Sequence, residues 1–530
     1  MQKMNAASKN HVEAIKAALD GLEVLGELPA YARDGFAAVP PAAWERLKWY
    51  GVYVQRPREE QKLMLRIKLP GGLMRADQAL VVAALAQRYG RGLVDITTRQ
   101  DLELHWLAVE DLPAMFAALG ACGLTTRQAA GDGPRNIIAS PVAGVEPGEV
   151  IDVRPLVREL DGFFDGNRDF SNLPRKFKIS ISGHPAYAAQ GESNDLSFSP
   201  AEKVVGSESI LGFHVRVGGG LATQPQLAKE LDVFVRPEEV LTLARGVAAV
   251  FKEHGYRERR NHCRLKYLLA DWGEARFLEE LLRHTGPLLR KGTALEAAQV
   301  SAPGWLGWQA QKQSGRSWLG LAVPAGRMTS KELEALAKMA CLYGDGSLHV
   351  SADQNVVLLN LASSCKAEIL QEAVLLRLTP FPSVLEGLAL TCPGKEVCPF
   401  AVISTKEWVP ELLSSLQKRV HGRNPLRIHV SGCPNSCVRP QMADLGLQGV
   451  FVNVGGKAAE GFEMLLGGGG LPAVLAQRLE GRIPAEQVES VLEEFILFFE
   501  SEKREQESFG DFVARQGLAV FQERFNAYQV

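Results

Sequence analysis

Four cysteines in two short motifs are the residues of this chain best suited to chemistry. Cys392 and Cys398 lie in TCPGKEVC, and Cys433 and Cys437 lie in SGCPNSC, which gives a C-x5-C pair and a C-x3-C pair. Thiolates are soft ligands that favour iron–sulfur clusters, zinc or copper(I). Structural zinc sites more often use C-x2-C or C-x4-C pairs, so the wider spacing beside proline and glycine favours a cubane cluster. The alternatives are a zinc-stabilised scaffold and four buried cysteines without a metal.

An internal repeat indicates which elements position these motifs. At an offset of 254 residues two long stretches align without a gap, and the matched pairs include Pro70 with Pro324, Tyr89 with Tyr343 and Gln100 with Gln354. Each copy predicts a strand, a Pro/Gly turn, a helix ended by glycine, and a second strand. In the second copy the predicted helix carries an apolar stripe of Leu333, Leu336, Ala337, Ala340 and Cys341. Cys341 is therefore expected in the core rather than in a metal site.

A second repeat follows at an offset of 249 residues. It matches Ser182 with Ser431, Asp195 with Asp444, and Gly218 to Gly220 with Gly467 to Gly469. The chain thus consists of two pseudo-equivalent halves that meet near residue 300, and the crevice between such halves suits a large cofactor. His184 stands where the second half has Cys433. Only the second half carries the cysteine motifs.

The first half carries lysines where the second half leads into its cysteines. In LPRKFKISISG the alternation of a β-strand sends Lys176 and Lys178 to one face together with Ser180 and Ser182. Two ammonium groups on one face are unfavourable unless solvent or an anion accommodates them. A solvated edge strand is the alternative, but the matched segment runs directly into Cys433, which favours an anion site shared by both halves.

Two arginines are candidates for the same site. Arg99 lies in DITTRQDLELH, at the start of a predicted strand, and Arg135 follows the Gly/Pro-rich GDGP. Loop and strand-end positions of this kind commonly point side chains into clefts. Each arginine taken alone fits an ordinary exposed side chain equally well, so the assignment depends on the pair of lysines.

Composition sets the broad class of the protein. With 530 residues the chain exceeds one hydrophobic core, which predicts two or more domains. The net charge of −2 gives no general case for binding nucleic acid or a membrane surface. No apolar run reaches membrane length and the first residues do not form a signal peptide, so membrane insertion is not expected. Eight cysteines, half of them in two tight pairs, favour a reducing cytoplasm over a disulfide scaffold.

Taken in order, these motifs resemble the siroheme-dependent sulfite and nitrite reductases. The resemblance rests on the cysteine pairs, TTRQ, GPRN, LPRKFK, the Gly218 to Gly220 run after HVRV, and CRLKYL, and it covers roughly residues 50 to 520. It implies a [4Fe-4S] cluster on Cys392, Cys398, Cys433 and Cys437. It also implies that the sulfur of Cys437 is the axial ligand of the siroheme iron.

The resemblance also implies roles for basic residues. Arg99, Arg135, Lys176 and Lys178 resemble the four residues that bind the oxyanion and supply protons in this family. Siroheme carries many carboxylates, and Arg66, Lys68, Arg264 and Lys266 are candidates to bind them by motif position, with a solvated surface as the alternative. Cys263 in NHCRLKYL stands where a small apolar residue is usual, and we expect it to be buried.

The expected reaction is the six-electron reduction of a small oxyanion. Nitrite reductases of this family are expected to have Asn where this chain has Lys178, and Gln where it has Arg439, so these residues favour sulfite over the alternative, nitrite. PNSC, the segment from Asn194 to Pro200 and the chain length also resemble nitrite enzymes, and members of the family can reduce both.

No dinucleotide-binding or flavin motif is evident, so an external ferredoxin or flavoprotein subunit is the expected electron donor. A rival from another class is an oxygen-dependent corrin-pathway enzyme with the same cluster motif. Such enzymes are expected to be shorter and to lack the complete LPRKFK set.

The predicted fold is α+β and internally duplicated. We expect two ferredoxin-like (parachute) lobes and two siroheme- and cluster-binding α/β lobes, related by a pseudo-twofold axis. The expected boundaries are residues 1–50 for an N-terminal arm, 51–125 and 301–375 for the ferredoxin-like lobes, and 126–300 and 376–530 for the cofactor-binding lobes.

Overall fold

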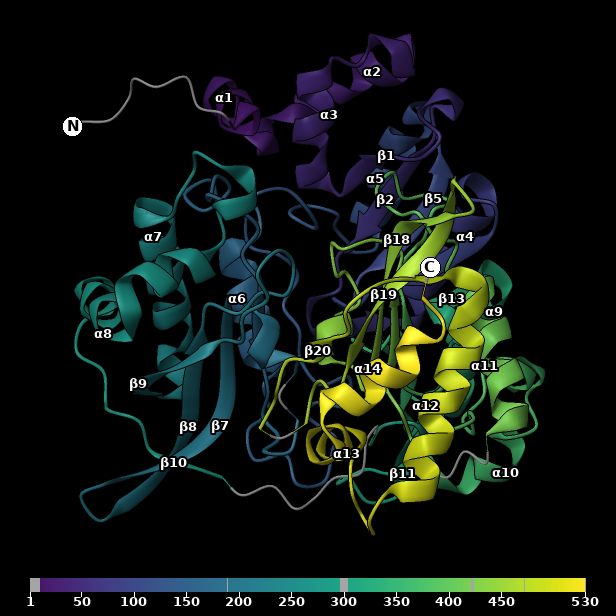
Figure 1. Cartoon of the computed structure of the whole chain (residues 1–530). Helices are drawn as coiled ribbons and strands as arrows, with labels where there is room; N and C mark the ends of the chain where they lie inside the picture. Colours follow the sequence, from purple (N-terminus) through teal and green to yellow (C-terminus); the bar gives the residue numbers. More distant parts are fainter. Residues whose placement is uncertain (1–9, 188, 296–303, 421–423, 471, 530) are drawn as a thin grey trace.

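The structure is a computed structural model that describes residues 10–187, 189–295, 304–420, 424–470 and 472–529. In Figure 1 the lobe of the first half, built around strands β7 and β8, lies at the left, and the corresponding lobe of the second half lies at the right. The N-terminal helices cover the top. These are α1 (His11–Ala18), α2 (Leu28–Asp34) and α3 (Pro41–Leu47).

The two ferredoxin-like halves repeat the same elements. The first contains β1 (Val52–Val54), β2 (Leu63–Ile67), β3 (Leu73–Arg75), α4 (Ala76–Tyr89), β4 (Leu93–Ile96), β5 (Leu102–Leu107) and α5 (Leu112–Ala121). The second contains β11 (Gly307–Ala310), β12 (Arg316–Leu321), β13 (Arg327–Thr329), α9 (Ser330–Tyr343), β14 (Ser347–Val350), β15 (Val356–Ala362) and α10 (Lys366–Ile369). The predicted repeat of strand, turn, helix and strand is confirmed.

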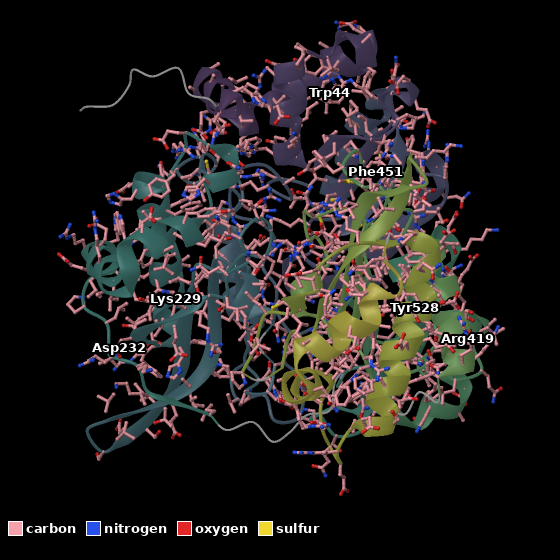
Figure 2. The ribbon with its side chains drawn as sticks, in the orientation of Figure 1. Trp44, Lys229, Asp232, Arg419, Phe451 and Tyr528 are labelled. Atoms are coloured by element: carbon pink, nitrogen blue, oxygen red, sulfur yellow. The ribbon has the colours of Figure 1, made fainter. Side chains whose placement is uncertain are left out.

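Each half completes its sheet with a strand from the other half. The two five-stranded sheets have the orders β1-β2-β5-β4-β13 and β11-β12-β15-β14-β3. Strand β13 pairs with β4, and β3 pairs with β14. The buried side chains of both halves form one hydrophobic cluster, which also includes Trp44 of α3 (Figure 2). Because strands and core are shared, the two halves depend on each other for their stability.

A pair of buried glutamines binds the halves together with matching hydrogen bonds. The side-chain amide of Gln100 donates to the carbonyl oxygen of Val350 at 2.9 Å, and that of Gln354 donates to the carbonyl oxygen of Ile96 at 2.8 Å. Both residue pairs are related by the offset of 254, so the contacts follow the pseudo-twofold relation. Both glutamines have a positive φ, of 59° and 62° respectively.

The two cofactor-binding lobes also share one plan. The first contains α6 (Arg154–Phe164), β6 (Ile179–Ile181), β7 (Leu196–Val205), β8 (Glu208–Val217), β9 (Lys229–Val235), α7 (Val240–His254), α8 (Leu265–Thr285) and β10 (Thr293–Ala294). The second contains β16 (Leu390–Thr391), α11 (Trp408–Arg419), β17 (Ile428–Ser431), β18 (Leu445–Val454), β19 (Lys457–Leu466), β20 (Gln477–Arg478), β21 (Ile483–Pro484), α12 (Val488–Glu502), α13 (Phe509–Gln516) and α14 (Leu518–Asn526).

The register of these lobes follows the offset of 249. In each lobe a short strand runs parallel to the first strand of a hairpin whose two strands have ten residues each: β6 beside the β7–β8 hairpin, and β17 beside β18–β19. Leu196 lies opposite Val217, and Leu445 lies opposite Leu466. The predicted α+β duplicated fold is thereby confirmed, while the domain boundaries stay predictions.

One expectation about the core was wrong. Leu333, Leu336, Ala337 and Ala340 of α9 are buried as the stripe predicts, but Cys341 is exposed. Cys341 lies at the edge of the stripe beside Leu342, which is 71% exposed, while Ala340 and Tyr343 of the same turn contact the shared core. A helical stripe predicts the centre of the buried face but not how far that face extends around the helix.

We predict that Gln354→Leu lowers the free energy of unfolding by about 3 kcal/mol, because the substitution leaves buried backbone groups of Ile96 and Thr391 unpaired. Gln309→Leu, at an exposed position of β11, is the control and changes it by about 0.5 kcal/mol or less. Urea unfolding followed by tryptophan fluorescence measures both. Equal losses in the two variants would contradict the role given to Gln354.

Candidate functional site

The four cysteines meet because their loops leave the same edge of one sheet. Strands β16 and β17 are parallel neighbours, with Leu390 opposite His429. Cys392 directly follows β16, and Cys433 follows β17 by two residues, so both loops start at the carboxyl ends of adjacent strands. The backbone N–H of Gly432 donates to the sulfur of Cys392 at 3.1 Å. A parallel pair therefore brings together two motifs that lie about 40 residues apart in sequence.

The spacing of the sulfurs fits a cluster better than a single ion. Burial raises the pKa of Cys392 to about 11 and that of Cys433 to about 12, and the negative charges of the other cysteines raise them too. Such an effect of charge requires short distances, so all four thiols are near neighbours. No three of these sulfurs, all within the described part of the chain, lie within 4.8 Å of one another. A tetrahedral zinc site with Zn–S bonds of about 2.3 Å needs sulfurs only about 3.8 Å apart. The donor set fits the larger [4Fe-4S] cluster.

Cys437 differs from the other three cysteines. It is exposed, whereas Cys392 and Cys433 are buried and Cys398 is partly buried. Its carbonyl oxygen accepts a hydrogen bond of 3.0 Å from the hydroxyl of Thr98, in the turn that carries Arg99. The exposed thiol therefore lies at the boundary between the halves, next to the basic residues of the first half.

Two of the predicted basic residues, Arg99 and Arg135, are held by hydrogen bonds to the first half. The guanidinium of Arg99 donates to the side-chain oxygen of Asn194 at 3.1 Å and to the carbonyl oxygen of Asn136 at 2.7 Å. Arg135 donates to the carbonyl oxygen of Gly131. The Nε atoms of both arginines are buried without a partner among the described residues.

Lys176 and Lys178 have no such anchors. Their ammonium groups make no hydrogen bond or ion pair with any residue that the structure describes. Phe177 and Ile179 point into the core of the lobe, so the alternation predicted for this segment is confirmed. On the lysine side, the buried hydroxyl of Ser180 also has no partner in the described chain.

Electrostatics show that the predicted quartet is one cluster. Burial lowers the pKa of Arg99 to about 9 and that of Arg135 to about 10, despite nearby carboxylates. Burial and the neighbouring Arg99 and Arg264 hold the pKa of Lys178 well below its usual range, while Asp195 and Cys437 act in the opposite direction. Burial and the ammonium of Lys178 do the same to the pKa of Lys176. Cations packed this closely are stabilised by an anionic ligand, and strongly shifted groups of this kind mark functional sites.

The predicted siroheme-binding residues already have partners within the chain. Arg66 pairs with Glu103 at 2.6 Å, and Lys68 pairs with two carboxylates, those of Asp161 and Asp165. In a second group, Arg264 pairs with Asp195 at 2.8 Å, and Lys266 donates to the carbonyl oxygens of Gly220, Thr223 and Gln224. Their contacts with siroheme carboxylates stay predictions. Among the described residues, the buried polar atoms left for such a cofactor or its anion include the Nε atoms of Arg99 and Arg135 and the hydroxyl of Ser180. The ammonium groups of Lys176 and Lys178 are available as well.

Sequence reasoning missed the residues that orient this cluster. Asn194 and Asn136 hold Arg99, and Asp195 holds both the backbone of Lys178 and the guanidinium of Arg264. The match of Asp195 with Asp444 was the available signal for the aspartate. Cys263 is buried and its thiol donates to the carbonyl oxygen of Arg259 at 2.8 Å, as expected for a packing residue.

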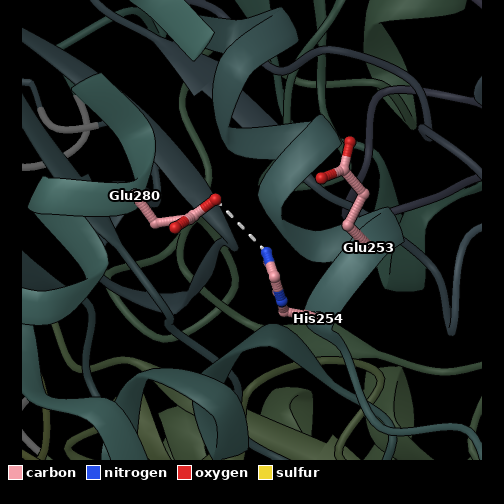
Figure 3. A group of neighbouring side chains, drawn as sticks. All are labelled: Glu253, His254 and Glu280. Atoms are coloured by element: carbon pink, nitrogen blue, oxygen red, sulfur yellow. Dashed lines mark ion pairs between the residues drawn. The ribbon is translucent and has the colours of Figure 1, made fainter. Parts of the chain in front are cut away.

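A separate group of side chains has metal-binding chemistry but no further sign of a ligand. Glu253 and His254 at the end of α7 lie near Glu280 of α8, and Figure 3 shows the ion pair of 3.4 Å between His254 and Glu280. Glu253 is exposed and the other two residues are half-buried. The group fits an ordinary ion pair between helices.

Comparisons with known proteins agree with this geometry. A family model described as the nitrite and sulphite reductase 4Fe-4S domain matches residues 130–287 and 389–529, and one described as the nitrite/sulfite reductase ferredoxin-like half domain matches residues 56–122 and 309–375. The ferredoxin–nitrite reductase of Synechococcus elongatus is 36% identical over 92% of this chain and 96% of its own length. The assimilatory ferredoxin-dependent nitrite reductase of Haloferax mediterranei is 32% identical over 95% of this chain and 91% of its own.

A solved structure, that of the NirA protein of Mycobacterium tuberculosis, superposes with a TM-score of 0.89 at 30% identity and covers 96% of both chains. Within the described residues, none of the helices combines the length and apolar character needed to cross a membrane.

We predict that Cys433→Ser removes most of the cluster iron and acid-labile sulfide, because an alcohol is a poor substitute for a thiolate ligand. Cys263→Ser is the matched control, since it alters a buried thiol outside the cluster and leaves a hydroxyl that can donate to Arg259. Iron and sulfide analysis of protein purified without air measures the effect. Full iron and sulfide in Cys433→Ser would contradict the assignment.

Proposed function

The chain belongs to the nitrite and sulphite reductase family, and within it we propose that this enzyme reduces nitrite to ammonia. Membership establishes an oxidoreductase with siroheme and a [4Fe-4S] cluster. The observation that carries the choice of nitrite is that relatives matching more than nine-tenths of the chain are nitrite reductases. This choice replaces the expectation of sulfite.

The expectation of sulfite depends on Lys178 and Arg439, and neither charge requires a dianionic substrate. The guanidinium of Arg439 lies 3.4 Å from the carboxylate of Asp353, so its charge is partly balanced within the protein. Lys178 adds a positive charge, which attracts a monoanion such as nitrite too, although less strongly than a dianion. The residue types at these two positions therefore support sulfite less strongly than similarity along the whole chain supports nitrite.

The protein residues would hold the cofactors as follows. Cys392, Cys398, Cys433 and Cys437 would bind the cluster, and the exposed Cys437 would also bind the siroheme iron, which is consistent with its place at the boundary between the halves. When bound, the siroheme and the cluster supply electrons to the anion.

The basic quartet binds the anion and supplies protons. Arg99 is fixed by Asn194 and Asn136, so it presents its donors in one orientation with little loss of entropy on binding. The ammonium groups of Lys176 and Lys178 have no partner among the residues that the structure describes, and they complement the charge of the anion. Reduction of nitrite to ammonium consumes six electrons and eight protons and releases two waters. Because burial and like charges lower the pKa of both lysines, their ammonium groups release protons more readily than exposed lysines.

Sulfite is the second candidate substrate. The unpaired ammonium of Lys178 favours it, because sulfite carries a second negative charge above a pKa near neutrality. Both anions fit one site of the same chemistry, so the preference between them is a matter of relative affinity and turnover.

The electron donor is proposed to be a ferredoxin. Both relatives described above are named as ferredoxin-linked enzymes, and the chain has no dinucleotide-binding motif of its own. A flavoprotein subunit is the other donor to test.

We predict that kcat/KM for nitrite exceeds that for sulfite by at least about tenfold, a difference of about 1.4 kcal/mol in transition-state stabilisation. Lys178→Asn should increase this ratio further, since it removes the charge that a dianion requires most. Lys457→Asn, at the exposed tip of the β18–β19 hairpin, is the control. Turnover of each anion with reduced ferredoxin measures the ratio. A ratio in favour of sulfite would contradict the proposed substrate.

A further inference from the structure

Two buried aspartates occupy equivalent places in the two halves. Asp195 and Asp444 are separated by the offset of 249, and each accepts a backbone N–H from the residue that precedes the short parallel strand. Lys178 donates to Asp195 at 2.9 Å, and Arg427 donates to Asp444 at 2.8 Å. Lys178 and Arg427 are themselves related by the same offset. The halves therefore provide an internal comparison of two cationic side chains in one setting.

In the second half the cation at this position binds its own aspartate. The guanidinium of Arg427 donates to Asp444 through Nε at 3.0 Å and through Nη2 at 2.7 Å. Its Nη2 also donates to the carbonyl oxygen of Gly468 at 2.9 Å. Arg427 thus donates its backbone N–H to Asp444 and also neutralises the Asp444 carboxylate with its guanidinium.

In the first half another residue makes these contacts. Arg264, which directly precedes α8, donates to Asp195 through Nε at 3.2 Å and through Nη2 at 2.8 Å. Its Nη2 also lies 3.4 Å from the carbonyl oxygen of Gly219, the equivalent of Gly468. Arg264 reproduces the bonding of Arg427 from a different part of the chain, and the ammonium of Lys178 makes no hydrogen bond with the described residues.

Lys178 is long enough to take the place of Arg264. The Nζ atom of a lysine lies one bond further from the backbone than the Nε atom of an arginine, and Nε of Arg427 already reaches Asp444. The side chain of Asp195 is 0% exposed, and a buried carboxylate requires a cationic partner. Among the other charged groups around Lys178, Arg99 is held by Asn194 and Asn136, and Lys176 and Cys437 are not partners of Asp195.

We propose that Arg264 is a positioning residue that occupies Asp195 and thereby keeps the ammonium of Lys178 available to the anion. This inference rests on the proposed function of the basic quartet as the oxyanion site. It gives Arg264 a role within the protein that differs from the predicted contact with siroheme carboxylates. Loss of Arg264 would let Lys178 pair with Asp195 and would remove one cation from the anion site.

The test compares Arg264→Met with Arg427→Met in the holoenzyme. Both variants remove the guanidinium partner of an equivalent aspartate, so both are expected to lower the thermal midpoint. Only Arg264→Met should raise KM for nitrite, by about tenfold, because it weakens binding of the anion; it should also lower kcat, because Lys178 paired with Asp195 supplies protons less readily. Equal KM values in the two variants would overturn the proposal and leave Arg264 a purely structural role.

A double-mutant cycle tests whether the effect passes through Lys178. In a Lys178→Met background, Arg264→Met should raise KM by no more than about twofold. If Arg264 instead acted on the anion directly through its charge, Arg264→Met would raise KM by the same factor with or without Lys178. Should Arg264→Met fail to fold, Arg264→Lys serves in its place with a smaller rise in KM, since a single ammonium holds Asp195 less completely.

A second readout does not depend on turnover. Acetylation of Lys178 as a function of pH, followed by mass spectrometry, reports the protonation of its amine. Pairing with Asp195 stabilises the charged form, so the midpoint of labelling should move upward by about one pH unit or more in Arg264→Met and stay in place in Arg427→Met. An upward shift without nitrite turnover would contradict the proposed substrate alone, and nitrite turnover with an unshifted midpoint would contradict the role of Arg264 alone.

Discussion

The site depends on the boundary between the halves, where Cys437 of the second half lies near the cations of the first. Cys437 is the exposed member of the cysteine group, and its carbonyl oxygen is bonded to Thr98, next to Arg99. Neither half provides this arrangement alone. The strands exchanged between the ferredoxin-like halves and the matched contacts of Gln100 and Gln354 hold the two sides in register, so the duplication is a requirement of the site as well as of the fold.

The two halves share the same backbone arrangement but carry different functional side chains on it. The hydroxyls of Ser182 and Ser431 each donate to the carbonyl oxygen two residues on, which belongs to His184 in one half and to Cys433 in the other. The backbone is the same in both halves where the side chain differs. The second half keeps its cation paired in Arg427 and Asp444, whereas the ammonium of Lys178 in the first half has no partner in the described part of the chain. Packing like charges together lowers stability, and functional sites commonly accept such a cost.

Much of this could be predicted from the sequence because it depends on local pattern. The cysteine spacing, the two offsets, and the alternation of Lys176 with Phe177 and Ile179 each follow from residue order. What could not be predicted depends on contacts across the fold. Strands β3 and β13 each pair with a strand of the other half, far away in the chain. Likewise Asp195 binds the distant Arg264 and not the side chain at the position of Lys178. Cys341 fits its helical stripe, yet it lies at the exposed edge of the buried face, since Tyr343 after it still contacts the core.

The central proposal is that Cys437 would hold the siroheme iron as well as the cluster. Mössbauer spectroscopy of the iron-57-enriched enzyme tests it most directly, because an oxidised [4Fe-4S] cluster is diamagnetic in isolation and acquires magnetic splitting only when a paramagnetic iron is coupled to it. The account predicts that the cluster irons show this induced splitting in the wild-type enzyme. A diamagnetic cluster spectrum beside a paramagnetic siroheme would contradict it.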